Sequence, residues 1–353
     1  MMVKLVVHIG HGKTGSSSIQ RSLLEATKQL ELQGIKYLGL MLEHARNASR
    51  PVWQVRTGSD RFFDQTIATQ ANQELSTVLE EELKQLTDQG VATAIWSNEW
   101  LLERPNHTLP ALKGLRDKGF EIEFQCYVRR HDKWAQSAYT QWGIKHKSYT
   151  GPILDFPDWL IVFGERQFQF SPSLSIWDEA FGDRLSVFNF DSAGDVVQHF
   201  LQANGILNIA SLNENVSADP IFVAAQTVFN SRKAAPVLPL AFETILKTTE
   251  RGDENRVFLP TLDKLMPTTE ILERLVKDRA EDITQINTLL IRSGEPPLSF
   301  EIPAKKVQHP TPWEMDQFIL KLLFAYAEEA GVMRGQIAAL QQQVAALKNN
   351  GTR

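Results

Sequence analysis

The first eighteen residues constrain the fold more than any other stretch of the chain. Residues 4–9 (KLVVHI) form a short apolar run with three β-branched side chains, which predicts a strand. A glycine-rich segment, residues 10–18 (GHGKTGSSS), follows at once. Apolar residues then recur at helical spacing, at Ile19, Leu23, Ala26 and Leu30. The amino-terminal stretch therefore predicts a strand, a loop and a helix.

The loop has the composition of an anion-binding site. Gly10, Gly12 and Gly15 let the backbone turn sharply, so that successive N–H groups can face one point beside the positive end of the helix. Lys13 adds a mobile positive charge. Four hydroxyl side chains lie in the same segment: Thr14, Ser16, Ser17 and Ser18. We expect this loop to bind a phosphate or a sulfate.

The spacing of the loop residues points to a particular anion. The nucleotide-triphosphate loop, G-x-x-x-x-G-K-[ST], requires a glycine five residues before Gly12, and that position is Val7. The remaining pattern, Gly-x-x-Lys-Thr-Gly-Ser-Ser followed by Ile19-Gln20, resembles the loop of the sulfotransferases that use 3′-phosphoadenosine 5′-phosphosulfate (PAPS). In that family the loop binds the 5′-phosphosulfate. The alternative interpretation is an ordinary glycine turn between a strand and a helix.

A second motif resembles the same family. Arg129 follows an apolar run at residues 121–128, and Ser137 lies eight residues later in the next helical pattern. In the PAPS-dependent sulfotransferases an Arg and a Ser at this separation bind the 3′-phosphate, which suits a forked guanidinium and a hydroxyl. The family often has Asn-Pro or Asp-Pro after the Arg, whereas Arg130-His131 stands here. The resemblance covers roughly residues 3–220, with only the two phosphate motifs specific.

Strand and helix patterns alternate through the first half of the chain. The strands are predicted at residues 4–9, 34–38, 91–96, 121–128 and 185–190. This alternation predicts a parallel β-sheet flanked by helices, an α/β fold that the resemblance specifies as a P-loop or sulfotransferase-like three-layer sandwich. Ligands in such folds bind outside the carboxyl ends of the strands. The polar clusters at residues 10–18, 97–99 and 129–137 all fall at that edge.

The second half of the chain is mainly helical. We predict an α/β domain over residues 1–250, a connector with accessory helices over 251–312, and a C-terminal helix over 313–353. Apolar residues of the tail alternate in four-three spacing: Ile319, Leu323, Tyr326, Ala330, Met333, Ile337, Leu340, Val344 and Leu347. This heptad pattern predicts either a coiled coil that forms homo-oligomers or a terminal helix packed on its own domain.

Composition limits the partners and the compartment. The chain has 37 Lys and Arg against 42 Asp and Glu, and the net charge of -5 argues against a general nucleic-acid or anionic-membrane binder. Cys126 is the only cysteine, which fits a reducing compartment. No stretch reaches the roughly 18 uninterrupted apolar residues of a membrane-spanning helix. We expect a cytoplasmic protein, and the resemblance implies a bacterial-type member of the family. No metal is expected, because no His, Cys or carboxylate cluster has metal-ligand spacing.

The resemblance implies an in-line transfer of a sulfuryl group to an acceptor hydroxyl that loses its proton. It implies that Lys13 stabilises the leaving phosphate oxygen, and that Ser16 and Ser17 hold the 5′-phosphate. Two residues are candidates for the general base: Glu99, directly after the strand at 91–96, and His44, beyond the second strand. We favour Glu99, because a strand end fixes geometry better than a long loop does.

The sequence is compatible with several acceptor classes and with two other functions. Aromatic and basic residues at positions 142–149 suit a glycan or glycolipid acceptor, and a hydroxylated lipid or small metabolite also fits. A nucleotide-dependent kinase would need a magnesium-binding Asp at a strand end, whereas residues 97–99 are Ser-Asn-Glu and residues 129–130 are Arg-Arg. A non-catalytic nucleotide-binding assembly protein would work through the coiled tail.

Overall fold

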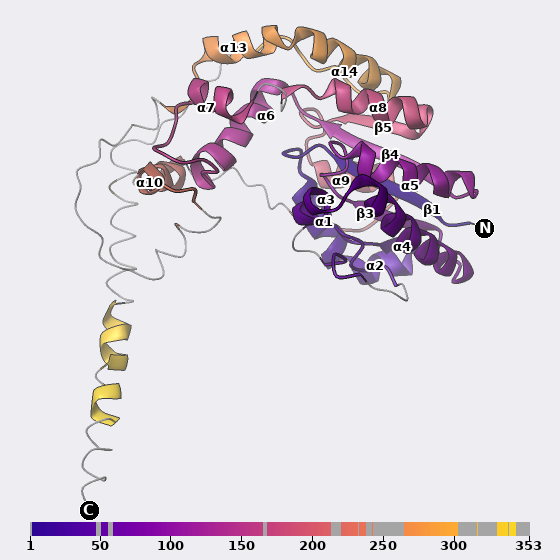
Figure 1. Cartoon of the computed structure of the whole chain (residues 1–353), viewed down its shortest axis with the longest axis horizontal. Coiled ribbons are helices and arrows are strands. Elements are labelled where there is room, and N and C mark those ends of the chain that lie inside the picture. Colours follow the sequence, from indigo (N-terminus) through magenta and orange to yellow (C-terminus); the bar gives the residue numbers. More distant parts are fainter. Residues whose placement is uncertain are drawn as a thin grey trace, which may run out of the picture. The chain divides into compact units, whose positions relative to one another are not determined.

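The structure is a computed structural model of the chain (Figure 1). It describes residues 2–46, 51–55, 59–164, 168–212, 220–231, 233–237, 242, 265–302, 316, 330–337 and 339–343. The chain divides into two compact units. The first consists of Met1–Ala138, Leu160–Ser217 and Thr268–Pro303, and the second of Tyr139–Trp159, Ala218–Pro267 and Ala304–Arg353. All the candidate site residues belong to the first unit.

The first unit is built on one sheet of five parallel strands. These are β1 (Lys4–Gly10), β2 (Ile35–Tyr37), β3 (Thr93–Ser97), β4 (Glu121–Val128) and β5 (Leu185–Asn189). Their order is β2-β3-β1-β4-β5, and every neighbouring pair is parallel. In the centre, His8 pairs with Ser97 of β3 and with Gln125 of β4. The predicted parallel sheet is therefore confirmed, and the ends of β3 and β4 flank the loop that follows β1.

Helices cover both faces of this sheet (Figure 1). On one face Val6, Ile95 and Tyr127 belong to a buried cluster with residues of α1 (Ser16–Glu25), α2 (Thr27–Leu32) and α9 (Val196–Ala203). On the other face the Phe124 ring lies 5.4 Å from Trp177 of α8 (Ser171–Phe181). There α5 (Pro105–Asp117) packs against α8 and α4 (Ala68–Asp88). Helices thus cover both faces of the sheet, as is usual for a parallel sheet.

Asp282 ties the later helices to the sheet unit. This residue lies on α14 (Ala280–Arg292), and its carboxylate accepts the N–H groups of Phe170 and Ser171 at 3.1 and 2.9 Å, which caps α8 from a distant segment. Its Oδ2 atom also lies 2.6 Å from Nε2 of His131 on α6 (His131–Ala138). Burial acts to raise the pKa of Asp282, but the hydrogen bonds from His131 and Ser171 outweigh it and leave the pKa below its usual value.

Two further helices and a short turn complete the described part of the first unit. They are α3 (Ser59–Gln65), α13 (Thr269–Asp278) and the 3-10 turn η3 (Gly182–Arg184). α13 packs against α6, while α14 packs against α8 and β5. Both α13 and α14 lie in the stretch predicted as connector and accessory helices, residues 251–312, and here they pack on the α/β unit. Residues 251–264 of that stretch lie outside the described residues.

The described part of the second unit contains helices joined by non-helical segments. It contains the π-helix η1 (Tyr139–Lys145) packed against α10 (Pro220–Ser231), and α7 (Phe156–Phe163) begins within it. The buried Lys147 ammonium donates to the carbonyl oxygens of Gly151 and Lys233. Burial lowers the pKa of this lysine. Lys147 is thus enclosed, although the sequence suggests it for an acceptor surface.

The predicted heptad is described only in part. Residues 330–337 and 339–343 are helical, and Met333, Ile337 and Leu340 are 41, 54 and 60% exposed. Positions 319, 323, 326, 344 and 347 lie outside the described residues, so the coiled coil stays a prediction. In the described part of the chain, no helix combines the length and apolar character needed to cross a membrane.

Candidate anion-binding and active site

The loop at residues 10–18, called the anion loop from here on, is held by its own hydrogen bonds. The hydroxyls of Thr14 and Ser16 both donate to the carbonyl oxygen of His11. The His11 N–H donates in turn to Tyr127 O of β4 at 2.9 Å. Thr14 and Ser16 are buried, whereas Lys13 is half-buried and Ser17 is exposed. The two buried hydroxyls therefore shape the loop, and Lys13 and Ser17 present side chains at its surface.

Gly15 makes the junction between the anion loop and α1. It is the N-cap of α1, with φ at 84°, and has no side chain to cap the first amides of the helix. The first helical hydrogen bond runs from Ile19 N to Gly15 O at 3.1 Å. A Cβ at Gly15 would lie 2.5 Å from Cγ1 of Val196, so the close packing requires glycine. The first-turn amides can therefore donate to an anion at the loop.

Glu99 lies directly beside the start of the anion loop. A Cβ on Gly10 would lie 2.9 Å from the carbonyl oxygen of Glu99, so the two backbones touch. The buried Gln20 of α1 donates through Nε2 to Oε2 of Glu99 at 2.7 Å and to Ser97 O at 3.3 Å. Gln20 thereby fixes the half-buried Glu99 carboxylate next to the loop.

His44 lies farther along the same edge of the sheet. It follows β2, which is separated from β1 by β3. Its ring centroid lies 6.0 Å from that of Tyr37, and its N–H donates to Leu38 O at 3.1 Å. Within the described residues, no contact joins His44 to the anion loop. The structure therefore brings Glu99, and not His44, to the loop.

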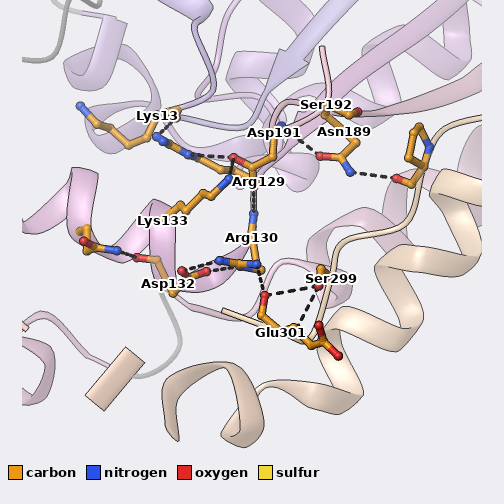
Figure 2. A network of polar contacts seen from close by, with 12 residues as sticks. Lys13, Arg129, Arg130, Asp132, Lys133, Asn189, Asp191, Ser192, Ser299 and Glu301 are labelled. Atoms are coloured by element: carbon orange, nitrogen blue, oxygen red, sulfur yellow. Dashed lines mark hydrogen bonds and ion pairs between the residues drawn. The ribbon is translucent and has the colours of Figure 1, made fainter. Parts of the chain in front are cut away.

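Arg129 joins the second predicted motif to the anion loop (Figure 2). Its Nη1 lies 3.5 Å from the carbonyl oxygen of Lys13, although the two residues are 116 positions apart. The guanidinium lies over the Phe190 ring, 5.0 Å from its centroid. Burial lowers the pKa of Arg129, and the nearby Asp191 carboxylate opposes this effect. Figure 2 shows the Lys13 side chain extending away from the guanidinium, so Arg129 contacts the backbone of the loop.

Asp191 and Lys133 complete what we call the charged cluster: Arg129, Lys133 and Asp191. Asp191 follows β5, and its Oδ1 lies 3.1 Å from Lys133 Nζ and 3.6 Å from Arg129 Nε. Lys133 and Ser137 are four residues apart on α6, which places them on one face of the helix. Ser137 is half-buried, and no hydrogen bond joins it to Arg129 in the described structure.

Arg130 has a structural role beside this cluster. Its Nε and Nη2 donate to the two oxygens of Asp132 at 2.5 and 2.9 Å, and its Nη1 donates to Glu301 O at 2.6 Å. The side chain is buried, and the hydrogen bond to Asp132 raises its pKa. This charge is compensated, so Arg130 anchors α6 and does not add to the positive charge at the site.

Several contributors to the site are not found from the sequence motifs. Trp134 Nε1 donates to Gly12 O at 2.8 Å, and His11 Nε2 lies 3.6 Å from Oε1 of Glu103. The neighbouring His11 ring lowers the pKa of Glu103. Lys133 did carry a signal, because it lies four residues after Arg129 and four before Ser137. Trp134 and Asp191 carried none, since their roles depend on segments that meet only in the folded chain.

The charges around the site favour a multiply charged anion. Lys13, Arg129 and Lys133 bring three positive charges to the site, Asp191 contacts Arg129 and Lys133, and the Glu99 carboxylate lies beside the loop. Within the described residues, no group of three or more His, Cys, Asp or Glu side chains is placed to hold a metal ion. The site can therefore bind an anion through backbone amides, a guanidinium and ammonium groups.

No protein-family model matches the sequence, and no curated protein matches it either. Among solved structures, the chain is similar to the crystal structure of a sulfotransferase from Alicyclobacillus acidocaldarius, with a TM-score of 0.40 and 15% identity. The match covers 81% of this chain and 95% of that chain. A similarity this low does not indicate the function of this chain, which is inferred from its site residues.

Proposed function

We propose that this protein is a sulfotransferase that moves the sulfuryl group of PAPS to a hydroxyl or amine of an acceptor. The observation that most supports this proposal is the approach of Arg129 to the carbonyl of Lys13. It unites a glycine loop suited to a 5′-phosphosulfate with a guanidinium suited to a 3′-phosphate. PAPS carries these two anionic groups on one adenosine, and the positive charge around the loop fits them.

In this proposal the donor is bound by both halves of the site. Gly10, Gly12 and Gly15 allow the loop to close around the phosphosulfate, which accepts from the first-turn amides of α1 and from Ser17. Thr14 and Ser16 act by holding the loop in shape, because their hydroxyls donate to His11 O. Arg129 and Ser137 bind the 3′-phosphate.

The chemistry requires a cation at the leaving group and a base at the acceptor. The Lys13 ammonium stabilises the negative charge that grows on the phosphate oxygen as its bond to sulfur breaks. Glu99 accepts the proton of the acceptor hydroxyl as the new bond to sulfur forms. We prefer Glu99 to His44, because Glu99 touches Gly10 and its carboxylate is fixed by Gln20.

A glycan or glycolipid is the acceptor class that we propose. This choice comes from sequence composition, because aromatic and basic residues occur at 142–149. Lys147 does not contribute, since it is buried. Transfer from radiolabelled PAPS to panels of glycans, lipids and phenols would identify the acceptor. A label that enters only phenols or lipids would overturn this choice of acceptor and leave the choice of donor intact.

Thermal-shift titration tests the donor directly. Adenosine 3′,5′-bisphosphate should stabilise the protein without magnesium, because a ligand bound only to the folded state raises the melting temperature. Stabilisation only by ATP with magnesium would contradict the proposal and favour a kinase. Stabilisation by neither nucleotide would contradict nucleotide binding altogether.

Substitution of Glu99 tests the base. Glu99→Gln should lower kcat about 100-fold and leave the affinity for adenosine 3′,5′-bisphosphate within about twofold, because a general base acts on the acceptor. Glu31→Gln is the matched control, since Glu31 is an exposed residue paired with Lys36. A full rate in Glu99→Gln together with a large loss in His44→Gln would move the role to His44.

A further inference from the structure

Lys133 is a cation of the site that neither phosphate motif includes. Its Nζ lies 3.1 Å from Oδ1 of Asp191, and the same oxygen lies 3.6 Å from Nε of Arg129. The other oxygen of Asp191 accepts the Arg130 backbone N–H at 3.1 Å. Figure 2 shows the side chains of Lys133 and Arg129 converging on Asp191. Two cations therefore share one carboxylate oxygen, and the cluster keeps a net positive charge.

The three side chains of this cluster differ in how far they are exposed to solvent. The Asp191 side chain is 16% exposed, that of Arg129 is 24% exposed, and that of Lys133 is 38% exposed. The carboxylate thus lies deeper than the two cations that it joins. The ammonium and the guanidinium are therefore more accessible to a solvent anion than the carboxylate is.

Arg130 provides an internal comparison. Its side chain, which makes two hydrogen bonds to Asp132 and one to Glu301 O, is 7% exposed. A cation with this purpose is buried and has a carboxylate of its own. Lys133 differs in both respects, because it is partly exposed and shares the Asp191 carboxylate with Arg129.

We propose that Lys133 is a third binding side chain for the 3′-phosphate, and that Asp191 is the positioning residue that sets Lys133 beside Arg129. This inference rests on the proposed function, since it takes an adenosine with a 3′-phosphate as the ligand. A phosphate monoester is close to a dianion at pH 7. Arg129 and Lys133 against Asp191 leave a net positive charge, which attracts this dianion. Lys133 therefore helps to select nucleotides that carry the 3′-phosphate.

Isothermal titration calorimetry with two nucleotides tests the role of Lys133. Adenosine 3′,5′-bisphosphate and adenosine 5′-monophosphate differ only in the 3′-phosphate. Lys133→Gln should weaken the bisphosphate about tenfold or more and the monophosphate by no more than about twofold, because one charge-assisted contact is lost. Lys133→Arg should keep the wild-type preference, since it keeps the charge. Lys84→Gln is the matched control, because Lys84 is also a helical lysine paired with one carboxylate, Glu80, at 2.7 Å.

The outcomes separate this inference from the proposed function. If the wild-type protein does not prefer the bisphosphate, the proposed function fails and the inference fails with it. If the wild type prefers the bisphosphate and Lys133→Gln keeps the full preference, only the role of Lys133 is overturned. An equal loss for both nucleotides in Lys133→Gln also overturns that role, since it indicates a general disturbance of the site.

Discussion

The anion loop and the charged cluster lie side by side, yet they are held by opposite kinds of interaction. Neutral hydrogen bonds hold the loop: Thr14 and Ser16 donate to His11 O, and Trp134 donates to Gly12 O. Charges hold the cluster, where Asp191 lies between Arg129 and Lys133. The two hydroxyl bonds of the loop are buried, whereas the cations of the cluster are partly exposed.

This difference suggests a division of work between the two regions. Buried neutral hydrogen bonds are little affected by salt and keep atoms in one arrangement, which a group-transfer reaction needs at its reacting centre. Partly exposed ion pairs are screened and contribute little to stability, so their cations can exchange a carboxylate for a ligand phosphate. The loop is therefore suited to holding a ligand in a fixed position, and the cluster is suited to binding its phosphate. The following changes test this contrast.

Loss of the Lys13 ammonium should have the largest effect. Lys13→Ala should lower kcat by about 100- to 1,000-fold, because a preorganised charge at the leaving oxygen is removed. Steady-state transfer from PAPS measures this loss. The exposed Lys28 on α2 provides the control Lys28→Ala, which should keep the wild-type rate. A rate loss below about threefold in Lys13→Ala would contradict a role at the reacting centre.

Acidification should lower the stability of the protein through the buried, neutral His8. His8 is buried on β1, two residues before Gly10, with Nδ1 2.8 Å from Ser97 Oγ, and burial lowers its pKa from 6.5 to about 4. Between these two values the unfolded chain binds more protons than the folded one. The contribution of His8 to the free energy of unfolding is therefore complete above pH 6.5 and is lost as the pH falls through about 4. The total loss is about 3 kcal/mol.

Urea midpoints measured across this pH window check the role of His8. The wild-type midpoint should fall on acidification, and His8→Asn should show a shallower fall whatever its absolute stability. An equal slope in the two proteins would mean that His8 does not titrate in this way.

Alanine substitutions at two glycines should have a smaller effect, on stability, and distinguish loop packing from backbone strain. Gly15 and Gly90 both have positive φ, at 84° and 75°, but a Cβ meets Val196 only at Gly15 and meets nothing within 4 Å at Gly90. Both alanine variants lose about 1 kcal/mol to the left-handed backbone, and Gly15→Ala loses about 2 kcal/mol more through overpacking. Chemical denaturation measures the two losses. Equal losses in both variants would show that the contact with Val196 does not restrict the loop.

Much of the fold follows from local patterns in the sequence. Apolar runs separated by helical spacing predict the parallel sheet, and the glycines after residue 9 predict the loop between β1 and α1. The structure places Glu99 beside the anion loop, because β3 lies next to β1, while its predicted role as general base stays a prediction. These features are predictable because periodicity and turn chemistry depend on near neighbours along the chain.

The partners of individual side chains were decided only by the tertiary structure. Both Thr14 and Ser16 turn toward His11 O, although their residue types alone suit direct contact with an anion. Likewise, Asp191 meets Lys133 only because β5 lies beside β4. By itself the sequence determined which residue types collect at the carboxyl edge of the sheet. Packing decided which of them are paired with one another, because a hydrogen bond or ion pair depends on distances of a few ångströms between segments far apart in the chain.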